Sequence, residues 1–429
     1  MSCRLRTLIT VLLVAVPAAS QAQTAARLTL KDAEQQALQN HPAIRATQFS
    51  AQAAGETVRE ARAAYFPTVL GSVTGTEALD DSRITAGALN NPIIYDRAAT
   101  GVYVSQLVTD FGRTHDLVAS ARLRADARQQ DVGFRRADVL LQVDRAYFAA
   151  LRAQAVQRVA EQTVAARQLV VDQVTALAAS NLKSSLDVSF ANVSLSEAKL
   201  LLVQAKNDVQ SSFATLSTAL GAPRMVAYDM QDEPLPPSPP DDAAPLVAEA
   251  LRERADIASA RLEREGAATF ADAQHGLRLP VVSVAGAAGV TPWHQPELND
   301  RYAAVGINLS VAVTNGNLFP ALEAEARLRA NAEEQRYRDL ENVVTRDVQI
   351  AWLAAQTAFQ RLDLTSQLLA RASDALELAQ ARYGLGLSSI VELTQAQLSK
   401  TQAEIEQASA RYDYQTRTAA LKFETGTLK

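Results

Sequence analysis

Two acidic residues, Asp187 and Glu392, occupy matching places in the chain, 205 residues apart (392 − 187). Each follows a short segment whose Asn or Gly residues predict a turn between two helices. A carboxylate in the first turn of a helix is stabilised by the helix dipole. Carboxylates that line a shared passage instead favour cations over anions, and crowding raises their pKa values. The spacing is compatible with both interpretations.

Other residues that commonly carry chemistry form no recognisable constellation. The histidines His41, His115, His275 and His294 are scattered, and the only cysteine is Cys3. We find no Gly-x-Ser-x-Gly nucleophile motif, no metal-binding spacing and no phosphate-binding loop. The sequence therefore predicts a protein that is not an enzyme and that has no catalytic residue, metal site or cofactor.

The composition favours long helices. The 429 residues are 48% hydrophobic but only 5% aromatic, and 17 Gly and 15 Pro are few for this length. A formal net charge of −5 argues against a nucleic-acid partner, because such proteins are usually basic.

The first 22 residues read as a secretory signal peptide. Arg4 and Arg6 precede an apolar run over residues 8–16, and residues 20–22, Ser-Gln-Ala, form a cleavage site. No later segment is apolar for long enough to predict a membrane-spanning helix.

The mature chain is duplicated. The heptapeptide at residues 121–127 returns nearly unchanged at 326–332, again 205 residues later (326 − 121). The same offset relates Asp187 to Glu392 and Gly221 to Gly426. This predicts two structural repeats, residues 23–227 and 245–429, joined by a proline-rich extended linker at residues 228–244.

Each repeat is expected to contain a helix, two strands and a long helical hairpin. The predicted opening helices are residues 30–64 and 245–276. The predicted strands are residues 68–78, 100–109, 281–290 and 302–313. The predicted long helices are residues 114–179 and 322–383, and each is followed by a return helix that ends at 221 or 426. Strands of about ten residues suit a tilted crossing of a bilayer, but they are equally compatible with a soluble sheet.

Several short motifs, in this order and duplicated, resemble the TolC-like outer-membrane channel proteins. They are residues 28–33, 37–38 and 40–42 in the opening helix, 107–113 at the first strand-to-helix junction, and Arg382-Tyr383-x-x-Gly386, Glu392-Leu393 and Ala396-Gln397 around the second turn. The second junction, residues 313–319, lacks the aromatic residue found at Phe111. Ser388 stands where the family sometimes has a basic residue, and Gln395 where it has an acidic one.

The resemblance implies a homotrimer in the outer membrane that extends into the periplasm. Each protomer would give four strands to a β-barrel, in contact with outer-membrane lipid, and long paired helices to an α-helical barrel. The function implied is a passive exit duct of a tripartite efflux pump or type I secretion system, with a periplasmic adaptor and an inner-membrane pump as partners. The alternative is a periplasmic coiled-coil adaptor or scaffold without membrane strands.

The resemblance also implies roles for particular residues. The gated periplasmic entrance would involve Asp187, Glu392, Tyr383 and Gln395. The tips that contact the adaptor would be Asn181, Leu182, Gly386, Leu387 and Ser388. Tyr383 either packs under its tip or bonds to a neighbouring hairpin. The aromatic residues Trp293 and Tyr302 are expected at the membrane interface.

Overall fold

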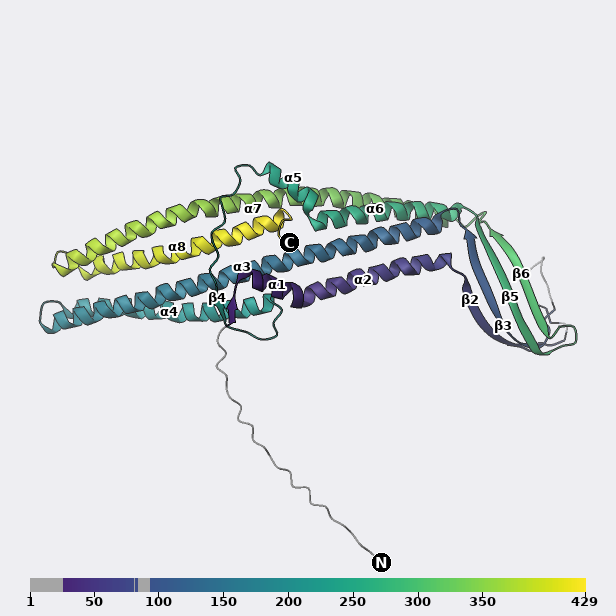
Figure 1. Cartoon of the computed structure of the whole chain (residues 1–429), viewed down its shortest axis with the longest axis horizontal. Helices are drawn as coiled ribbons and strands as arrows, with labels where there is room; N and C mark the ends of the chain where they lie inside the picture. The colour runs from purple at the N-terminus through teal and green to yellow at the C-terminus, as the bar shows by residue number, and fades with distance from the viewer. Residues whose placement is uncertain (1–25, 81, 84–92) are drawn as a thin grey trace, which may run out of the picture.

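The molecule is elongated, with helices along most of its length and one sheet at one end (Figure 1). The computed structural model describes residues 26–80, 82–83 and 93–429. The predicted signal peptide, residues 1–22, and much of the loop between the first two predicted strands lie outside this part. The expected class, mainly helical with a smaller strand portion, is confirmed.

The elements follow the same order in both halves. The first half contains β1 (Ala26–Leu28), α1 (Leu30–Asn40), α2 (Pro42–Arg62), a 3-10 turn η1 (Ala63–Tyr65), β2 (Thr68–Thr76), β3 (Arg97–Thr109), α3 (Arg113–Ala179) and α4 (Ser185–Ala219). After β4 (Tyr228–Met230), the second half contains α5 (Ala244–Glu253), α6 (Ala255–His275), η2 (Gly276–Arg278), β5 (Val281–His294), β6 (Arg301–Ser310), α7 (Leu318–Gly384) and α8 (Ile390–Glu424).

The helical hairpins reproduce the duplication residue for residue. Helices α3 and α7 both have 67 residues, and α4 and α8 both have 35. All four helices begin and end at positions related by the 205-residue offset (318 − 113 and 424 − 219, for example). At about 1.5 Å per residue, the longer helices span roughly 100 Å.

Each opening helix is broken into two, which corrects the prediction of single helices over residues 30–64 and 245–276. The breaks fall at His41 and Arg254, which have extended backbone conformations (ψ 121° and 129°) and are related by a shift of 213 (254 − 41). Pro42 begins α2, where its missing N–H costs nothing.

A glycine from the end of each hairpin packs against each break. Gly221 and Gly426 have φ values of +72° and +74°, a left-handed conformation that a side chain would strain. A Cβ atom at Gly221 would lie 3.1 Å from the backbone of His41, and one at Gly426 would lie 3.0 Å from the Arg254 nitrogen. Glycine therefore allows α4 and α8 to end directly against the opening helices.

The strands of the two halves form a single antiparallel sheet in the order β2-β3-β5-β6. The four predicted strands are present with shifted ends, because β3 begins earlier and β5 ends later than expected, whereas β2 and β6 end earlier. The halves meet where β3 pairs with β5.

One face of this sheet is apolar. The register places Val69 opposite Val104, Val104 opposite Gly286, and Gly286 opposite Val305, so these residues share a face. The large apolar side chains of this face are Val69, Val73, Val102, Val104, Val282, Val284, Val290, Val305, Ile307 and Leu309, and the face also carries Gln106 and Arg301. The opposite face carries Thr68, Ser72, Thr74, Ser105, Ser283, Asn308 and Ser310.

Tyr302 lies on the face of the sheet opposite to Val305, and its place at the membrane interface stays a prediction. It is opposite Gly289, which in turn is opposite Gly101, and a Cβ atom on either glycine would overlap the tyrosine ring or hydroxyl. The ring therefore covers two glycines on that face. Trp293 is opposite Ala98, which shares the apolar face with Val102, so its interface role stays a prediction.

The two strand-to-helix junctions have the same backbone despite their different sequences. Phe111 and Gly112 have φ values of 56° and 103°, and the equivalent Gly316 and Asn317 have 62° and 67°. Gly and Asn tolerate this left-handed conformation. The missing aromatic residue in the second junction therefore leaves its shape unchanged.

The linker is pinned to the helices rather than running free. Its first residues form β4, which pairs in parallel with β1, and the rest crosses the helices near mid-length (Figure 1). The Tyr147 hydroxyl donates a hydrogen bond to the Gln231 carbonyl at 2.6 Å, and the Trp352 indole donates to the Pro240 carbonyl at 2.8 Å. These two donors occupy equivalent positions (352 − 147 = 205).

None of the helices in the described part of the chain combines the length and the apolar character that a membrane-crossing helix needs.

Candidate functional site at the helical tips

The two hairpins turn with the same backbone geometry. Asn181 and Gly386 are equivalent and adopt left-handed conformations (φ 56° and 73°). In each turn the next residue donates a hydrogen bond back to the helix, from Leu182 N to Leu177 O at 2.9 Å and from Leu387 N to Arg382 O at 2.8 Å. This is the glycine or asparagine cap expected at a helix end. The tips therefore differ only in their side chains.

Four of the five predicted adaptor-contacting residues are at the surface of the tips. Leu182 and Leu387 are equivalent and 70% and 67% exposed. Asn181 and Gly386 are also exposed. Ser388 is half-buried, and its hydroxyl has no hydrogen-bond partner among the described residues. The two exposed leucines give each tip a small apolar surface.

Asp187 caps its own helix. Ser184 is the N-cap of α4, and its backbone nitrogen lies 3.0 Å from Asp187 Oδ2. The Asp187 nitrogen donates to the Ser184 hydroxyl at 3.2 Å, which completes a capping box. The simpler role predicted for this acid, stabilisation of a helix N-terminus, is therefore present in the structure.

Glu392 occupies the same place in α8 but binds a different partner. The Glu392 nitrogen donates to the N-cap Ser389 at 3.3 Å, as in the first hairpin. Its carboxylate instead accepts a hydrogen bond from Arg382 Nε at 3.0 Å. The ion pair links the end of α7 to the start of α8 and is about half exposed, so its contribution to stability is small.

Tyr383 is buried under the tips. It belongs to a hydrophobic cluster that joins the two hairpins and includes Val174, Ile390 and Leu393. The ammonium group of Lys183, from the other turn, lies 3.9 Å from the centre of the Tyr383 ring. Burial raises the pKa of Tyr383, and the nearby charge of Asp187 raises it further. The Tyr383 hydroxyl has no hydrogen-bond partner within the described part of this chain.

Two grooves run along the contact between the hairpins. The groove between α3 and α7 has a volume of about 840 Å³ and reaches Tyr383 and Lys183. The groove between α4 and α8 has a volume of about 560 Å³ and is lined by Gln395. Arg167 lines both grooves, is only 6% exposed, and has a terminal nitrogen without a partner among the described residues.

The structure therefore divides the predicted entrance residues into three places. Tyr383 and Asp187 lie close to each other across Lys183. Glu392 pairs with Arg382 within its own hairpin, and Gln395 lines the groove on the other side.

The sequence analysis did not single out Lys183, Arg382 or Arg167 as functional residues. Lys183 is equivalent to Ser388 (388 − 183 = 205), so the basic residue missing from the second tip is present in the first. Arg382 precedes Tyr383 in the recognised motif. Arg167 has no sequence signal, because a helix pattern alone does not reveal which neighbour covers an arginine.

The fold and the tips together define a class of protein. A sheet with one apolar face, set at the end of helical hairpins roughly 100 Å long, is a membrane-anchored subunit of a helical duct. The model of the family described as "Outer membrane efflux protein" matches residues 33–222 and 246–427. The chain belongs to this family.

Individual outer-membrane proteins are also similar to this chain in sequence or in fold. The outer membrane protein TolC of Escherichia coli is 22% identical over 414 residues, which cover 92% of this chain and 81% of TolC. OprJ of Pseudomonas aeruginosa is 26% identical over 384 residues, covering 86% and 78% of the two chains. The solved outer-membrane channel OprN has the same fold, with a TM-score of 0.81 and 19% identity over 93% of this chain and 90% of that one.

The chain is therefore an outer-membrane efflux channel protein, and its helices extend into the periplasm. One face of its sheet is mainly apolar, as in a strand that faces lipid, and the opposite face carries more polar side chains. The alternative of a periplasmic scaffold without membrane strands is wrong, because a four-stranded sheet with a lipid-compatible face is present.

Proposed function

We propose that three copies of this chain close a twelve-stranded barrel and a helical tunnel that conducts cargo passively out of the periplasm. The unpaired edges of the sheet carry this proposal. In the described part of the chain, β2 and β6 each pair on one side only. Exposed strand edges are not tolerated in a bilayer, because their backbone groups have no hydrogen-bond partners there. Further copies of the chain would supply the missing partners.

The helical tips would dock onto a periplasmic adaptor, which connects the channel to an inner-membrane pump. Leu182 and Leu387 support this assignment, since they are exposed at equivalent positions on identical turns. Three protomers would present six such tips in a ring with approximate sixfold symmetry. The protein would have no enzymatic activity, and the pump would supply the energy.

The entrance would be controlled by the residues under the tips. Tyr383, packed between the hairpins, and the Arg382–Glu392 ion pair would hold the resting arrangement. Three copies of Asp187 and Glu392 would form acidic rings that favour cations. Gln395 is neutral, so its three copies would not form a third acidic ring.

Bilayer recordings of the purified protein test the acidic rings. Replacing both acids (Asp187→Ala with Glu392→Ala) should weaken the preference for cations, measured as the reversal potential in a KCl gradient. The pair Asp187→Asn with Glu392→Gln removes the same charge but keeps the shape, and it should give the same loss. Unchanged selectivity in both variants would refute the rings.

Chemical cross-linking in outer-membrane fractions tests the assembly. The proposal requires a species of three chains. A protein that stays monomeric in that fraction would contradict it.

A further inference from the structure

A third hollow lies far from the tips, on the helical layer next to the sheet. Helices α2, α3, α6 and α7 lie side by side in this layer (Figure 1). The groove has a volume of about 790 Å³ and is lined by residues from all four helices. A hollow shared by four neighbouring helices of one layer is expected on the concave side of that layer, where the side chains of non-adjacent helices approach one another. In a closed tunnel, the concave side faces the lumen.

The repeated heptapeptide contributes two arginines to this groove. Arg124 and Arg329 are equivalent (329 − 124 = 205), and both line the hollow. Each lies eleven residues after the first residue of its helix (124 − 113 and 329 − 318), so the two are at the same level. The duplication has therefore placed a guanidinium group on alternate helices at one height.

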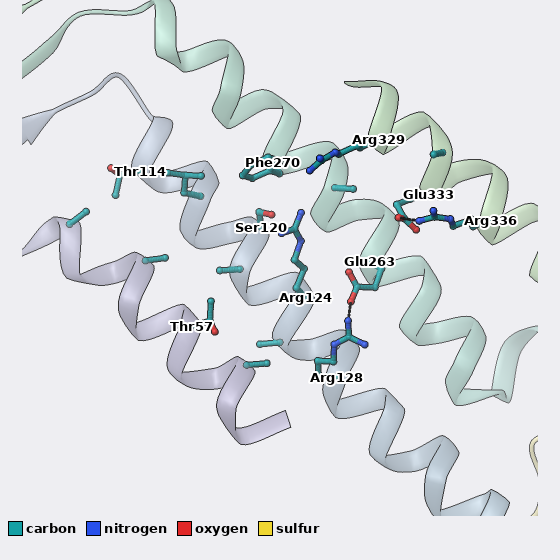
Figure 2. Close-up of a pocket in the computed structure, with 18 residues that line it drawn as sticks. Thr57, Thr114, Ser120, Arg124, Arg128, Glu263, Phe270, Arg329, Glu333 and Arg336 are labelled. Carbon is teal, nitrogen blue, oxygen red and sulfur yellow. Dashed lines mark hydrogen bonds and ion pairs between the residues drawn. The ribbon is translucent and has the colours of Figure 1, made fainter. Parts of the chain in front are cut away.

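These two guanidinium groups are available to a ligand. Arg124 has no carboxylate within ion-pair distance in the described part of the chain, and its guanidinium lies 5.2 Å from the centre of the Phe270 ring. Arg329 pairs with Glu325 at 2.6 Å, but its side chain is 72% exposed. Figure 2 shows Arg329 directed toward Phe270 from the other side of the groove.

The next level of the groove is electrically balanced. Arg128 pairs with Asp131 at 2.9 Å and with Glu263 at 3.1 Å. The equivalent positions carry the opposite signs, Glu333 and Arg336, and these also pair with each other (Figure 2). Among the described residues that line this groove, Arg124 is therefore the one arginine without an ion-pair partner, whereas Arg329 shares its charge with Glu325.

The wall around the arginines is small and apolar. The alanines that line the groove are Ala54, Ala61, Ala64, Ala121, Ala125, Ala267 and Ala332. Together with the face of Phe270, they offer a smooth surface that suits a flat apolar body. A guanidinium group binds a carboxylate or sulfonate through paired hydrogen bonds.

We propose that this level of the tunnel is a binding ring for aromatic organic anions in transit. The inference rests on the trimer of the proposed function, in which three copies of Arg124 and Arg329 place six guanidinium groups around the lumen. The anionic group of the ligand pairs with arginine, and its ring lies against Phe270 and the alanines. The ring has the opposite sign to the acidic entrance.

Calorimetric titration of the detergent-solubilised full chain with 1-naphthoate tests the ring. The wild-type protein should bind 1-naphthoate, and Arg124→Gln with Arg329→Gln should weaken binding by about tenfold, because charge-assisted hydrogen bonds are lost. The amine 1-naphthylmethylammonium has a similar ring and the opposite charge, and it should bind at least tenfold more weakly than 1-naphthoate.

A matched control lies in the same heptapeptide. Arg122 is exposed but does not line the groove, so Arg122→Gln should leave naphthoate binding unchanged. Equal effects of the Arg122 and Arg124–Arg329 substitutions, equal binding of the amine, or no binding of 1-naphthoate would each overturn the ring. Because binding is measured without conduction, failure of the bilayer experiment would count against the acidic rings and not against this binding ring, whereas a monomer in the cross-linking experiment would count against both the proposed function and this ring.

Discussion

At the scale of single residues, side-chain length separates the two acids at the tips. Asp187 and Glu392 occupy the same helical position after equivalent serine caps. The shorter Asp187 folds back onto Ser184, whereas the longer Glu392 reaches Arg382. The position equivalent to Arg382 in the first hairpin is Leu177 (382 − 177 = 205), so Asp187 has no arginine at that position to pair with. One helix end is therefore stabilised by its cap, and the other adds a link across its turn.

Asp144 gives the protein a pH-dependent element away from the tips. It is 3% exposed in α3, where burial, and then the neighbouring Glu34 carboxyl, raises its pKa to about 8. Because the folded state holds this proton more tightly than the unfolded state, its stabilising effect is full below pH about 4. The effect declines as the pH rises and is lost above about pH 8.

The Asp144→Asn variant should remove this part of the pH dependence. Asn is neutral at every pH, so the variant should gain stability relative to wild type between pH 5 and pH 9, by several degrees in Tm. Thermal unfolding in detergent at both pH values measures the difference. Parallel pH profiles for the two proteins would show that Asp144 does not titrate in this range.

At the scale of elements, the duplicated aromatic positions hold the linker. Tyr147 is fully buried and binds the linker where it leaves β4, whereas Trp352 binds it farther along, at Pro240. The linker thus connects the first hairpin to the second through hydrogen bonds. It is not the free extended segment that its prolines predict.

Removing the two donors should have unequal effects. Tyr147→Phe removes a donor from the partly buried carbonyl of Gln231 and from the buried carbonyl of Leu28, and it should cost about 1–2 kcal/mol. Trp352→Phe removes a more exposed hydrogen bond and should cost about 0.5 kcal/mol or less. Thermal unfolding and the rate of proteolysis within residues 231–243 measure both. A larger effect of Trp352→Phe would contradict the assignment of Tyr147 as the main anchor.

At the scale of the whole molecule, the sheet has an exposed apolar face. Val73, Val305 and Ile307 are each more than three-quarters exposed in a single chain. A soluble protein rarely leaves such a face in water, and a bilayer removes the cost. The position of the sheet at one end of the long helices places the tips far from the membrane (Figure 1).

Neighbouring residues on β6 test this orientation. Ile307→Lys puts a charge on the lipid face and should cost about 2–4 kcal/mol near the bilayer midplane, so less folded protein should reach the outer membrane. Asn308→Lys puts the same charge on the opposite, channel-lining face and should be tolerated. Heat-modifiable mobility of outer-membrane fractions measures both. Equal loss in both variants would contradict the assignment of the faces.

The sequence predicted the helical hairpins well because their pattern is local. The internal repeat fixed equivalent positions, and the Asn and Gly at the turns fixed the caps. It failed at His41, although the following Pro42 disfavours a helical conformation there, and at Arg254, which no proline follows. It also left open the face on which Tyr302 lies, because that depends on strand register rather than on residue type.

The sequence by itself determined the duplication, the element order and the position of the turns, since helix periodicity and backbone preferences act over a few residues. Tertiary structure alone decided which partners those residues meet. It brought Lys183 onto Tyr383, directed Glu392 toward Arg382, and gathered Arg124 and Arg329 in one groove. Such contacts join residues up to about two hundred positions apart, and only the packing of α3 and α6 with α7 and α8 sets their distances.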